Sequence, residues 1–320
     1  MKPKVLLTPD TKNLPTDVSD SLKELAEVQY VTGNYDAELK DATAVLVGTG
    51  KVNAEYLDKA PKLKLVARFG VGYDSVDVAE CTRRGIYVTH TPEVLSSGVA
   101  DHTWALILGF NRHIPLADTF TKTKWAKREG YIPFGWEIEE KTLGILGLGR
   151  IGLEVLKRAQ GFPVKTIYND LIRREDLEKK YGVEFVSFDE LMRRSDILTI
   201  HVSLQESSRG IINQEALAKM KHSAIIINTS RGPVIVEKAL IKALQEKKIK
   251  GAALDVYETE PTPLDNPLLK LDNVLLTPHS ASAAWETRRK MSIRSVGNVK
   301  AFLEGKRPQH LVPEQHEVSF

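Results

Sequence analysis

The fold of this chain is decided at residues 142–152, which have the sequence TLGILGLGRIG. An apolar segment runs there into a Gly-x-Gly-x-x-Gly turn, and residues 153–159 continue with apolar side chains at helical spacing. Gly147 permits the tight turn, Gly149 lets a pyrophosphate approach the backbone, and Gly152 lets the helix pack close to the strand. The first turn of that helix offers free N–H groups and the positive end of its dipole to phosphates. The pattern therefore predicts a strand, a turn and a helix that together bind a dinucleotide.

A carboxylate follows at the distance that such a motif requires. The next predicted strand ends beside Asp170, close to the ~20 residues after the last glycine at which an acid binds the adenosine ribose. Asp170 favours NAD, because a carboxylate repels the 2′-phosphate of NADP. Arg173 and Arg174 lie just beyond it and could attract that phosphate, so NADP, or use of both cofactors, stays open.

Strand-like and helical patterns alternate on both sides of this motif. Some strand-like segments, such as residues 224–227, are continuously apolar, which is typical of parallel strands covered on both faces. Helical patterns between them include residues 18–27, 189–194 and 238–247. The alternation predicts an α/β fold of two doubly wound, Rossmann-like domains with parallel sheets. The predicted strands are Val5–Thr8, Ala44–Val47, Leu65–Ala67, Ile86–Thr89, Thr142–Leu146, Thr166–Tyr168, Glu184–Val186, Ile197–Val202, Ala224–Asn228, Ala252–Val256 and Val274–Leu276.

Two long helical patterns, residues 92–113 and 282–304, bracket the segment that holds the glycine motif. We interpret them as the two crossings between domains. Residues 98–285 are then the dinucleotide-binding domain, and residues 1–97 and 286–320 together form a discontinuous, flavodoxin-like substrate domain. The length of 320 residues suits two domains.

The segment 119–141 differs from the rest of the predicted dinucleotide-binding domain. It is rich in Lys and aromatic residues and only weakly periodic. We expect an extended arm, which packs either on a partner subunit or on its own domain.

Composition narrows the class of function. The formal net charge is +3, and Lys and Arg are spread along the chain without the basic stripe and aromatics of a nucleic-acid groove. No run of 18 apolar residues is present, and Met1 leads almost directly into a predicted strand, so we expect no membrane span and a cytoplasmic location. The only cysteine, Cys81, excludes an intrachain disulfide and a thiolate metal cluster. The mild positive charge suits an anionic substrate and a phosphate-bearing cofactor.

Polar side chains follow three consecutive predicted strands. Arg231 comes after the strand at 224–228, Asp255 and Glu260 come at and after the end of the next one, and His279 follows the third. Because ligands of parallel α/β sheets bind at the carboxyl ends of the strands, we expect these side chains to meet at one edge, near the glycine turn.

The residue types fit hydride transfer between a nicotinamide and a 2-keto or 2-hydroxy acid. Arg231 can bind the substrate carboxylate through two hydrogen bonds. His279 can donate a proton to the developing alkoxide, and Glu260 can orient that imidazole and favour its protonated form. Asp255 either holds the nicotinamide end or tunes the His–Glu pair. Taken singly, each residue is as well explained by a surface ion pair, a loop histidine or a solvated acid, and only their joint arrangement supports the hypothesis.

The other histidines show no spacing that suggests metal ligands, and we predict no bound metal. Structural roles are expected for His90, His102, His113, His201 and His222.

The chain resembles the D-isomer-specific 2-hydroxyacid dehydrogenases over nearly its whole length. The motifs that carry the resemblance are FGVGYD at 69–74, TP at 91–92 with VAD at 99–101, the glycine turn, NTSRG at 228–232, residues 251–261, and TPH at 277–279. Within the family it is most similar to short 3-phosphoglycerate dehydrogenases and to glyoxylate or hydroxypyruvate reductases.

The resemblance implies a set of roles. Arg231, Glu260 and His279 become the catalytic residues for a small D-2-hydroxy acid or 2-keto acid. The backbone of Gly70, Val71 and Gly72 binds the substrate carboxylate together with Arg231. A homodimer forms through the cofactor domains. The implied cofactor contacts are Gly147, Gly149, Arg150, Ile151, Gly152, Asp170, Val202, Thr229, Ser230, Arg231, Asp255, His279, Ser280, Ala281 and Ser282.

Departures from the family pattern leave the substrate open. They are HVSL at 201–204, Val236 at an expected helix N-cap, Asp101 where Glu is usual, and Ser280-Ala281-Ser282 after the histidine. Arg68 is a candidate second anion contact, which would suit a phosphorylated or dicarboxylic substrate. The alternatives are an NAD(H)-sensing corepressor-like binding protein and a phosphite dehydrogenase, whereas Glu260 argues against a formate dehydrogenase.

Overall fold

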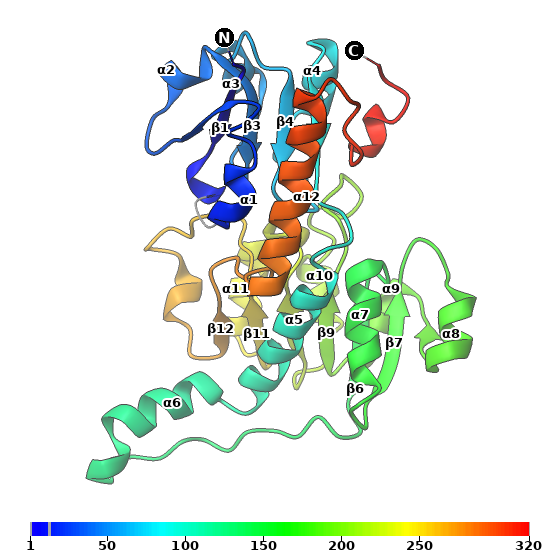
Figure 1. Ribbon diagram of the computed structural model, residues 1–320. Coiled ribbons are helices and arrows are strands. Elements are labelled where there is room, and N and C mark those ends of the chain that lie inside the picture. Colours follow the sequence, from blue (N-terminus) through cyan, green and yellow to red (C-terminus); the bar gives the residue numbers. More distant parts are fainter. Residues whose placement is uncertain (1, 12–13, 320) are drawn as a thin grey trace. The chain divides into compact units, whose positions relative to one another are not determined.

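The computed structural model describes residues 2–11 and 14–319 (Figure 1). The chain forms two compact units: unit 1 contains Met1–Leu95 and Ala283–Phe320, and unit 2 contains Ser96–Ser282. The boundaries predicted from the sequence, after residues 97 and 285, lie close to the divisions between these units. That one unit binds the dinucleotide and the other the substrate stays a prediction.

Unit 1 is built on a five-stranded parallel sheet with the order β2-β1-β3-β4-β5. This is the strand order of flavodoxin-like folds, as predicted. The helix α12 (Trp285–Leu303) packs on β4 and on α1 (Thr16–Asp20). The strands are β1 (Lys4–Leu7), β2 (Glu27–Tyr30), β3 (Ala42–Val47), β4 (Leu65–Arg68) and β5 (Tyr87–Thr89). The other helices are α2 (Asp36–Leu39), α3 (Ala54–Asp58) and α4 (Val78–Arg83), with short 3₁₀ turns η1 (Pro9–Thr11) and η5 (Pro313–Gln315).

The helix predicted over residues 18–27 was wrong in its second half. The helix α1 ends at Asp20, turns follow, and the chain enters β2 at Glu27. The strand β2 was not predicted, because it is an edge strand with exposed or half-buried side chains and its sequence lacks a continuous apolar run.

The C-terminal tail closes the opposite edge of the same sheet, beside β5. Thr89 and Leu311 form an antiparallel bridge. The buried Gln315 side chain accepts a hydrogen bond from the Val88 N–H (2.7 Å) and donates to the Ile86 carbonyl (2.9 Å). The tail thus satisfies backbone groups that an open edge would leave exposed.

Unit 2 contains a seven-stranded parallel sheet with the order β12-β11-β10-β9-β6-β7-β8. This order extends that of the dinucleotide-binding fold by one strand, which confirms the predicted fold. The strands are β6 (Thr142–Leu146), β7 (Lys165–Asn169), β8 (Glu184–Phe185), β9 (Ile197–Ile200), β10 (Ile225–Asn228), β11 (Gly251–Leu254) and β12 (Val274–Leu276). The helices are α5 (Ser96–Asn111), α6 (Ile114–Thr123), α7 (Arg150–Ala159), α8 (Glu175–Tyr181), α9 (Phe188–Arg194), α10 (Gln214–Ala218) and α11 (Glu237–Gln245), and the 3₁₀ turns are η2 (Trp125–Lys127), η3 (Gly232–Val234) and η4 (Pro267–Lys270).

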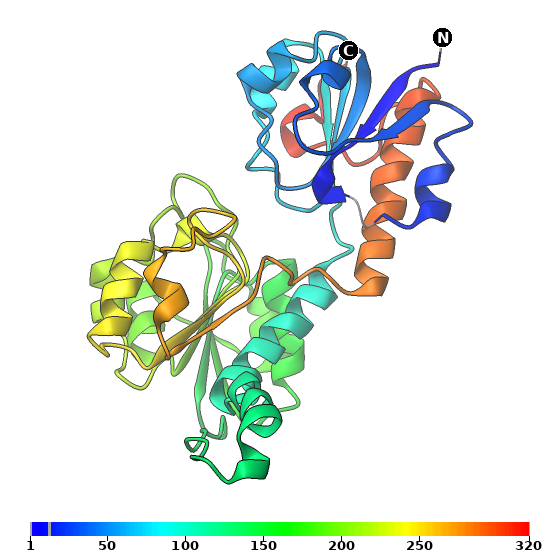
Figure 2. The ribbon, with the colours of Figure 1, turned by 90° about the vertical axis from the view of Figure 1, so that its left-hand side faces the viewer.

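Helices cover both faces of this sheet (Figure 2). Ile226 packs into the core under α9, α10 and α11, whereas Ile225 and Ile227 face the core under α5 and α7. The continuous apolar run of β10 is explained by this double coverage, because successive side chains of a strand point to opposite faces.

The predicted extended arm is partly helical. α6 and the short turn η2 occupy residues 114–127, and irregular chain then leads back to β6 (Figure 1). Three aromatic side chains in it are strongly exposed: Trp125 (66%), Tyr131 (85%) and Phe134 (96%). Trp136, towards the end of this segment, packs beside the sheet: Lys250 Nζ, just before β11, lies 3.1 Å from the centre of the Trp136 ring.

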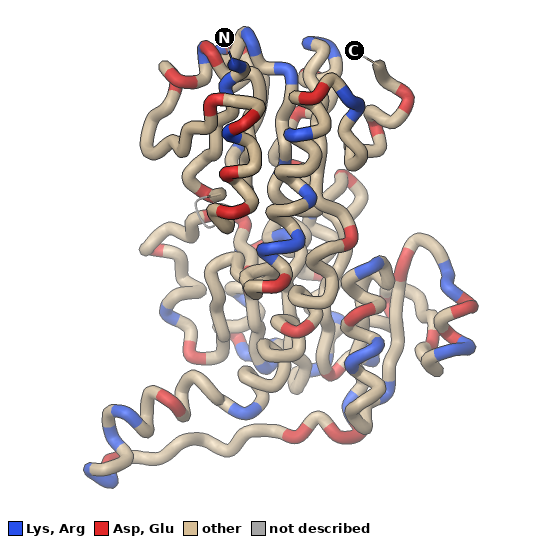
Figure 3. The backbone as a smooth tube through the Cα atoms, viewed as in Figure 1, with Lys and Arg blue, Asp and Glu red and all other residues tan. Residues whose placement is uncertain are grey.

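Acidic and basic residues are interspersed along the chain in both units (Figure 3). Ion pairs such as Arg158–Asp101 and Lys157–Glu154 link neighbouring helices or turns of one helix. None of the helices in the described part of the chain combines the length and apolarity needed to span a bilayer.

The start of α11 offers a test of stability. Val236 occupies its N-cap with extended backbone angles and provides no side-chain hydrogen bond to the first turn. Val236→Asp is expected to raise the stability of unit 2 by about 1 kcal/mol, because the carboxylate can accept from a first-turn N–H group. Urea unfolding should show a higher midpoint for Val236→Asp than for Val236→Ala, and equal midpoints would contradict the capping argument.

Candidate active site

The glycine turn has the geometry that a dinucleotide requires. Gly147 has a φ of 90°, in the region that favours glycine, and a Cβ on Gly152 would overlap the carbonyl oxygen of Gly147. A Cβ on Gly149 would meet no atom within 4 Å. The open space above Gly149 therefore lies where a pyrophosphate is expected, at the N-terminus of α7.

The acid after β7 lies beside this turn. The Asp170 Oδ2 accepts a hydrogen bond from the Leu148 N–H at 2.6 Å. The two arginines that could hold a 2′-phosphate are paired with carboxylates: Arg173 donates twice to Glu178 (3.0 and 2.8 Å) and Arg174 twice to Asp176 (3.1 Å each). Both pairs are exposed to solvent.

The three glycines allow a test that separates binding from folding. Gly149→Ala is expected to weaken NADH binding by about 1–3 kcal/mol, roughly fivefold to 150-fold, with little change in melting temperature, because the new methyl group enters only the space that the ligand would occupy. Gly152→Ala is the matched control and should lower the melting temperature, because its methyl group overlaps Gly147. Tight NADH binding by Gly149→Ala, measured by quenching of protein fluorescence, would exclude this turn as the cofactor site.

The loops after β10 and β11 are packed directly on each other. A Cβ on Gly232 would overlap the carbonyl group of Tyr257, so only glycine allows this approach. Asn228 shapes the first loop, donating from Nδ2 to the Arg231 carbonyl (2.9 Å) and accepting from the Ser230 N–H (3.0 Å). The guanidinium of Arg231 in turn donates to the Ser230 carbonyl at 2.8 Å.

His279 and Glu260 form a hydrogen-bonded pair. The distance from His279 Nδ1 to Glu260 Oε2 is 2.6 Å, and Glu260 Oε1 accepts from the Tyr257 N–H at 3.0 Å. Burial by itself raises the pKa of Glu260, but the hydrogen bond and charge of His279, with the positive charge of Arg231, outweigh it and leave that pKa below its usual value. The imidazole thus donates from Nδ1 to the Glu260 carboxylate, and the positive charge of Arg231 acts on the same carboxylate.

Asp255 holds the turn that carries His279. Its carboxylate is fully buried and accepts from the N–H groups of Ser280 and Ala281, both at 2.8 Å. Its backbone carbonyl accepts from the His279 N–H, also at 2.8 Å. Burial alone raises the pKa of Asp255, but these bonds and those of His102 and Thr277 hold it below its usual value.

Two further predicted cofactor contacts, Val202 and Thr229, lie at the same edge of the sheet. The Val202 side chain lies against Gly147, and the Thr229 hydroxyl lies 3.0 Å from that of Thr103. His102 also reaches this edge from α5, and no local pattern in the sequence marked it. Among residues 2–11 and 14–319, no group of three His, Cys, Asp or Glu side chains could hold a metal ion.

The predicted substrate loop belongs to unit 1, where Gly70, Val71 and Gly72 follow β4. The guanidinium of Arg68 is buried against Gly70 and donates to the Phe69 carbonyl. Arg68 is therefore packed beneath this loop, and its proposed contact with a second anionic group stays a prediction.

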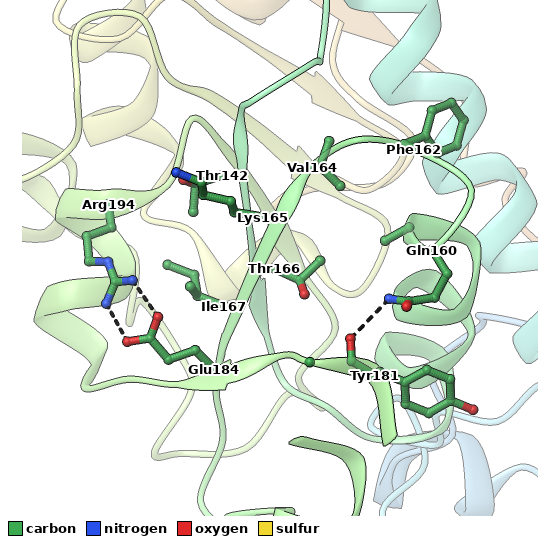
Figure 4. A pocket seen from close by; sticks show the side chains of 12 residues that line it. Thr142, Gln160, Phe162, Val164, Lys165, Thr166, Ile167, Tyr181, Glu184 and Arg194 are labelled. Carbon is green, nitrogen blue, oxygen red and sulfur yellow. Dashed lines mark hydrogen bonds and ion pairs between the residues drawn. The ribbon is translucent and has the colours of Figure 1, made fainter. Parts of the chain in front are cut away.

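A groove of about 360 Å³ in unit 2 lies away from these residues (Figure 4). It is lined by residues at the amino ends of β6 and β7, including Thr142 and Lys165, whereas the glycine turn follows the carboxyl end of β6. Two of its lining residues, Arg194 and Glu184, form an ion pair at one side of it. Its position at the opposite edge of the sheet separates it from the candidate site.

Comparison with known proteins identifies the family. A model described as "D-isomer specific 2-hydroxyacid dehydrogenase, NAD binding domain" matches residues 104–281. A glyoxylate reductase of Korarchaeum cryptofilum is 46% identical over 280 residues, which cover 87% of this chain and 84% of that protein.

Solved structures agree over almost the whole chain. An NADPH-dependent glyoxylate/hydroxypyruvate reductase of Sinorhizobium meliloti, in complex with NADP and malonate, matches with a TM-score of 0.87 and 34% identity, covering 98% of each chain. A D-lactate dehydrogenase of Aquifex aeolicus, complexed with NAD and lactic acid, matches with a TM-score of 0.85 and 32% identity, covering 96% of this chain and 98% of that one. The chain therefore belongs to the D-isomer specific 2-hydroxyacid dehydrogenase family.

Proposed function

We propose that this protein is an NAD(P)-dependent reductase of glyoxylate and hydroxypyruvate. The observation that carries the proposal is the pairing of His279 with Glu260 at 2.6 Å, beside Arg231, on the sheet edge that also holds the glycine turn. The similar proteins named as glyoxylate or hydroxypyruvate reductases support this substrate class.

Each residue has a defined task in the proposed reaction. The bound nicotinamide supplies the hydride, or accepts it in the reverse direction. Arg231 binds the substrate carboxylate and polarises the adjacent keto group. His279 donates a proton from Nε2 to the alkoxide oxygen, and Glu260 keeps the imidazole oriented through Nδ1 and stabilises its protonated form. In the proposal, the N–H groups of Gly70–Gly72 bind the same carboxylate as Arg231.

Residues around the turn fit the cofactor. Gly147, Gly149 and Gly152 with the start of α7 would hold the pyrophosphate, and Asp170 the adenosine ribose. Because Arg173 and Arg174 are both paired with carboxylates, we propose that NADH is preferred to NADPH.

A panel of 2-keto acids, assayed with NADH and NADPH side by side, tests the proposal. We expect rapid loss of NADH absorbance with glyoxylate and hydroxypyruvate. Oxidation of 3-phosphoglycerate in preference to either reduction would reassign the substrate. Very slow turnover with NADH-dependent peptide binding would indicate a corepressor-like protein, and NAD reduction on addition of phosphite would indicate a phosphite dehydrogenase.

We propose further that the protein is a homodimer in the cytoplasm, with the arm of residues 114–136 packed on a second copy of unit 2. Exposed aromatic side chains of this density are typical of an interface. The double variant Tyr131→Ser/Phe134→Ser is expected to shift the particle mass from dimer to monomer in size-exclusion chromatography with light scattering. Leu264→Ser, which removes an equally exposed side chain outside the arm, is the control. A monomeric wild-type protein, or an unchanged dimer in the double variant, would contradict this assembly.

A further inference from the structure

We propose that His102, on α5, is a positioning residue that holds the turn bearing His279 in its reactive geometry. The proposal rests on the proposed function, in which His279 is the proton donor. Nothing in the local sequence assigns His102 such a role, because its partners belong to loops more than 150 residues further along the chain.

The turn that carries His279 needs support. His279 has a φ of 50°, a left-handed conformation that costs a residue with a side chain about 1–2 kcal/mol. The backbone carbonyl of Asp255 accepts from the His279 N–H, and the Asp255 carboxylate accepts from the N–H groups of the next two residues, Ser280 and Ala281. The orientation of the Asp255 carboxylate therefore sets the path of the chain just after His279, and through it the position of the imidazole.

The Asp255 carboxylate is oriented in turn by Thr277 and His102. The Thr277 hydroxyl donates to Asp255 Oδ1 at 2.6 Å. Because its single proton lies in that bond, the same hydroxyl oxygen acts as an acceptor toward His102 Nε2, 3.1 Å away. His102 Nε2 therefore carries a proton, and it also lies 3.4 Å from Asp255 Oδ1.

His102 is mounted on a rigid support. Its neighbour Trp104 donates from Nε1 to the Val155 carbonyl of α7 (3.1 Å) and stacks on Phe162 at 4.4 Å between ring centres. Thr103 contacts Thr229 in the loop after β10. The helix α5 is thus held against both α7 and the edge of the sheet. His102 therefore has a fixed position from which it contacts Thr277 and Asp255.

Loss of the His102 donor should affect proton transfer more than substrate binding. The fully buried Asp255 would lose part of its hydrogen bonding, and the turn could relax so that the 2.6 Å contact of His279 with Glu260 lengthens. Arg231 is held in a different loop by Asn228, so the binding of the substrate carboxylate should be retained.

Three variants test the proposal in the full-length protein. His102→Leu is expected to lower kcat for glyoxylate reduction roughly tenfold to a hundredfold, the scale of an ångström-level misplacement of a catalytic group. The KM for glyoxylate should change little. His102→Gln should recover most of the loss, because its amide can donate a hydrogen bond where Nε2 does. His222→Leu is the control, since it removes an exposed histidine at the opposite edge of the same unit.

A second route covers the case in which His102→Leu folds poorly. Thr277→Val interrupts the same chain of hydrogen bonds, and Thr277→Ser preserves it. Thr277→Val should lower kcat for glyoxylate reduction as loss of the His102 donor does, and Thr277→Ser should retain most of it, because both residues act through Asp255. Equal kcat in His102→Leu and the wild type, or a His102→Gln variant no better than His102→Leu, would overturn the proposal.

A spectroscopic measurement separates this inference from the proposed function. Proton NMR should show a downfield resonance for the Nδ1–H of His279 bonded to Glu260, assigned by its absence in His279→Gln. His102→Leu should shift or broaden it, and His102→Gln should retain it. If the wild type reduces no 2-keto acid but the resonance behaves in this way, the proposed function fails and the positioning role stands. If the wild type is active and the resonance is unchanged in His102→Leu, only the positioning role fails.

Discussion

His279→Ala is expected to lower the turnover of glyoxylate by about 10²–10⁴-fold, the contribution of a positioned general acid. The reason is the 2.6 Å hydrogen bond to Glu260, which commits Nδ1 and presents Nε2 as the proton donor. NADH binding should be largely kept, because the glycine turn and Asp170 are unchanged by the substitution. Steady-state kinetics and fluorescence titration with NADH measure the two effects separately.

Glu260→Gln provides the matched control for this prediction. The amide can still accept from His279, so orientation is preserved while the negative charge is lost. Its loss of turnover should therefore be smaller than that of His279→Ala and greatest toward high pH, where the imidazole most needs the carboxylate to stay protonated. Wild-type turnover in His279→Ala would refute the assignment of the proton donor.

Arg231→Ala is the second substitution with a large expected effect. A guanidinium bound to a carboxylate forms two charge-assisted hydrogen bonds of about 1.5–3 kcal/mol each, so kcat/KM for glyoxylate should fall roughly 10²–10⁴-fold. Part of the fall should appear in KM, through lost binding, and part in kcat, through lost polarisation of the keto group. Both constants are measured with NADH at saturation.

Arg231→Lys distinguishes charge from geometry. Lysine keeps the positive charge but cannot form the two parallel bonds of a guanidinium, so its activity should lie between those of the wild type and Arg231→Ala. The backbone of the loop should be unaffected in both variants, since Asn228 binds the carbonyl of residue 231 and not its side chain. Unchanged KM and unchanged turnover in Arg231→Ala would exclude this residue from substrate binding.

Much of the fold was predictable because burial leaves a local signal. The run Ala224–Asn228 is apolar throughout since β10 is covered on both faces, and TLGILGLGRIG encodes a strand, a turn and a helix within one short segment. Elements without that signal were missed. The edge strand β2 has exposed or half-buried side chains, and α6, which overlaps the predicted extended arm, has no buried residue.

By itself, the sequence determined the order of strands and helices, the dinucleotide motif and the candidates Arg231, Glu260 and His279, because each of these depends on neighbouring residues or on the ends of apolar runs. Only the tertiary structure decided which side chains meet. The contact of Gly232 with Tyr257, the 2.6 Å pairing of His279 with Glu260, and the approach of His102 to Thr277 and Asp255 all join segments that are distant in the chain. Such contacts arise from the packing of α5 and three adjacent strands. The pattern of polar and apolar residues along the chain does not predict them, because it reports only on neighbouring residues.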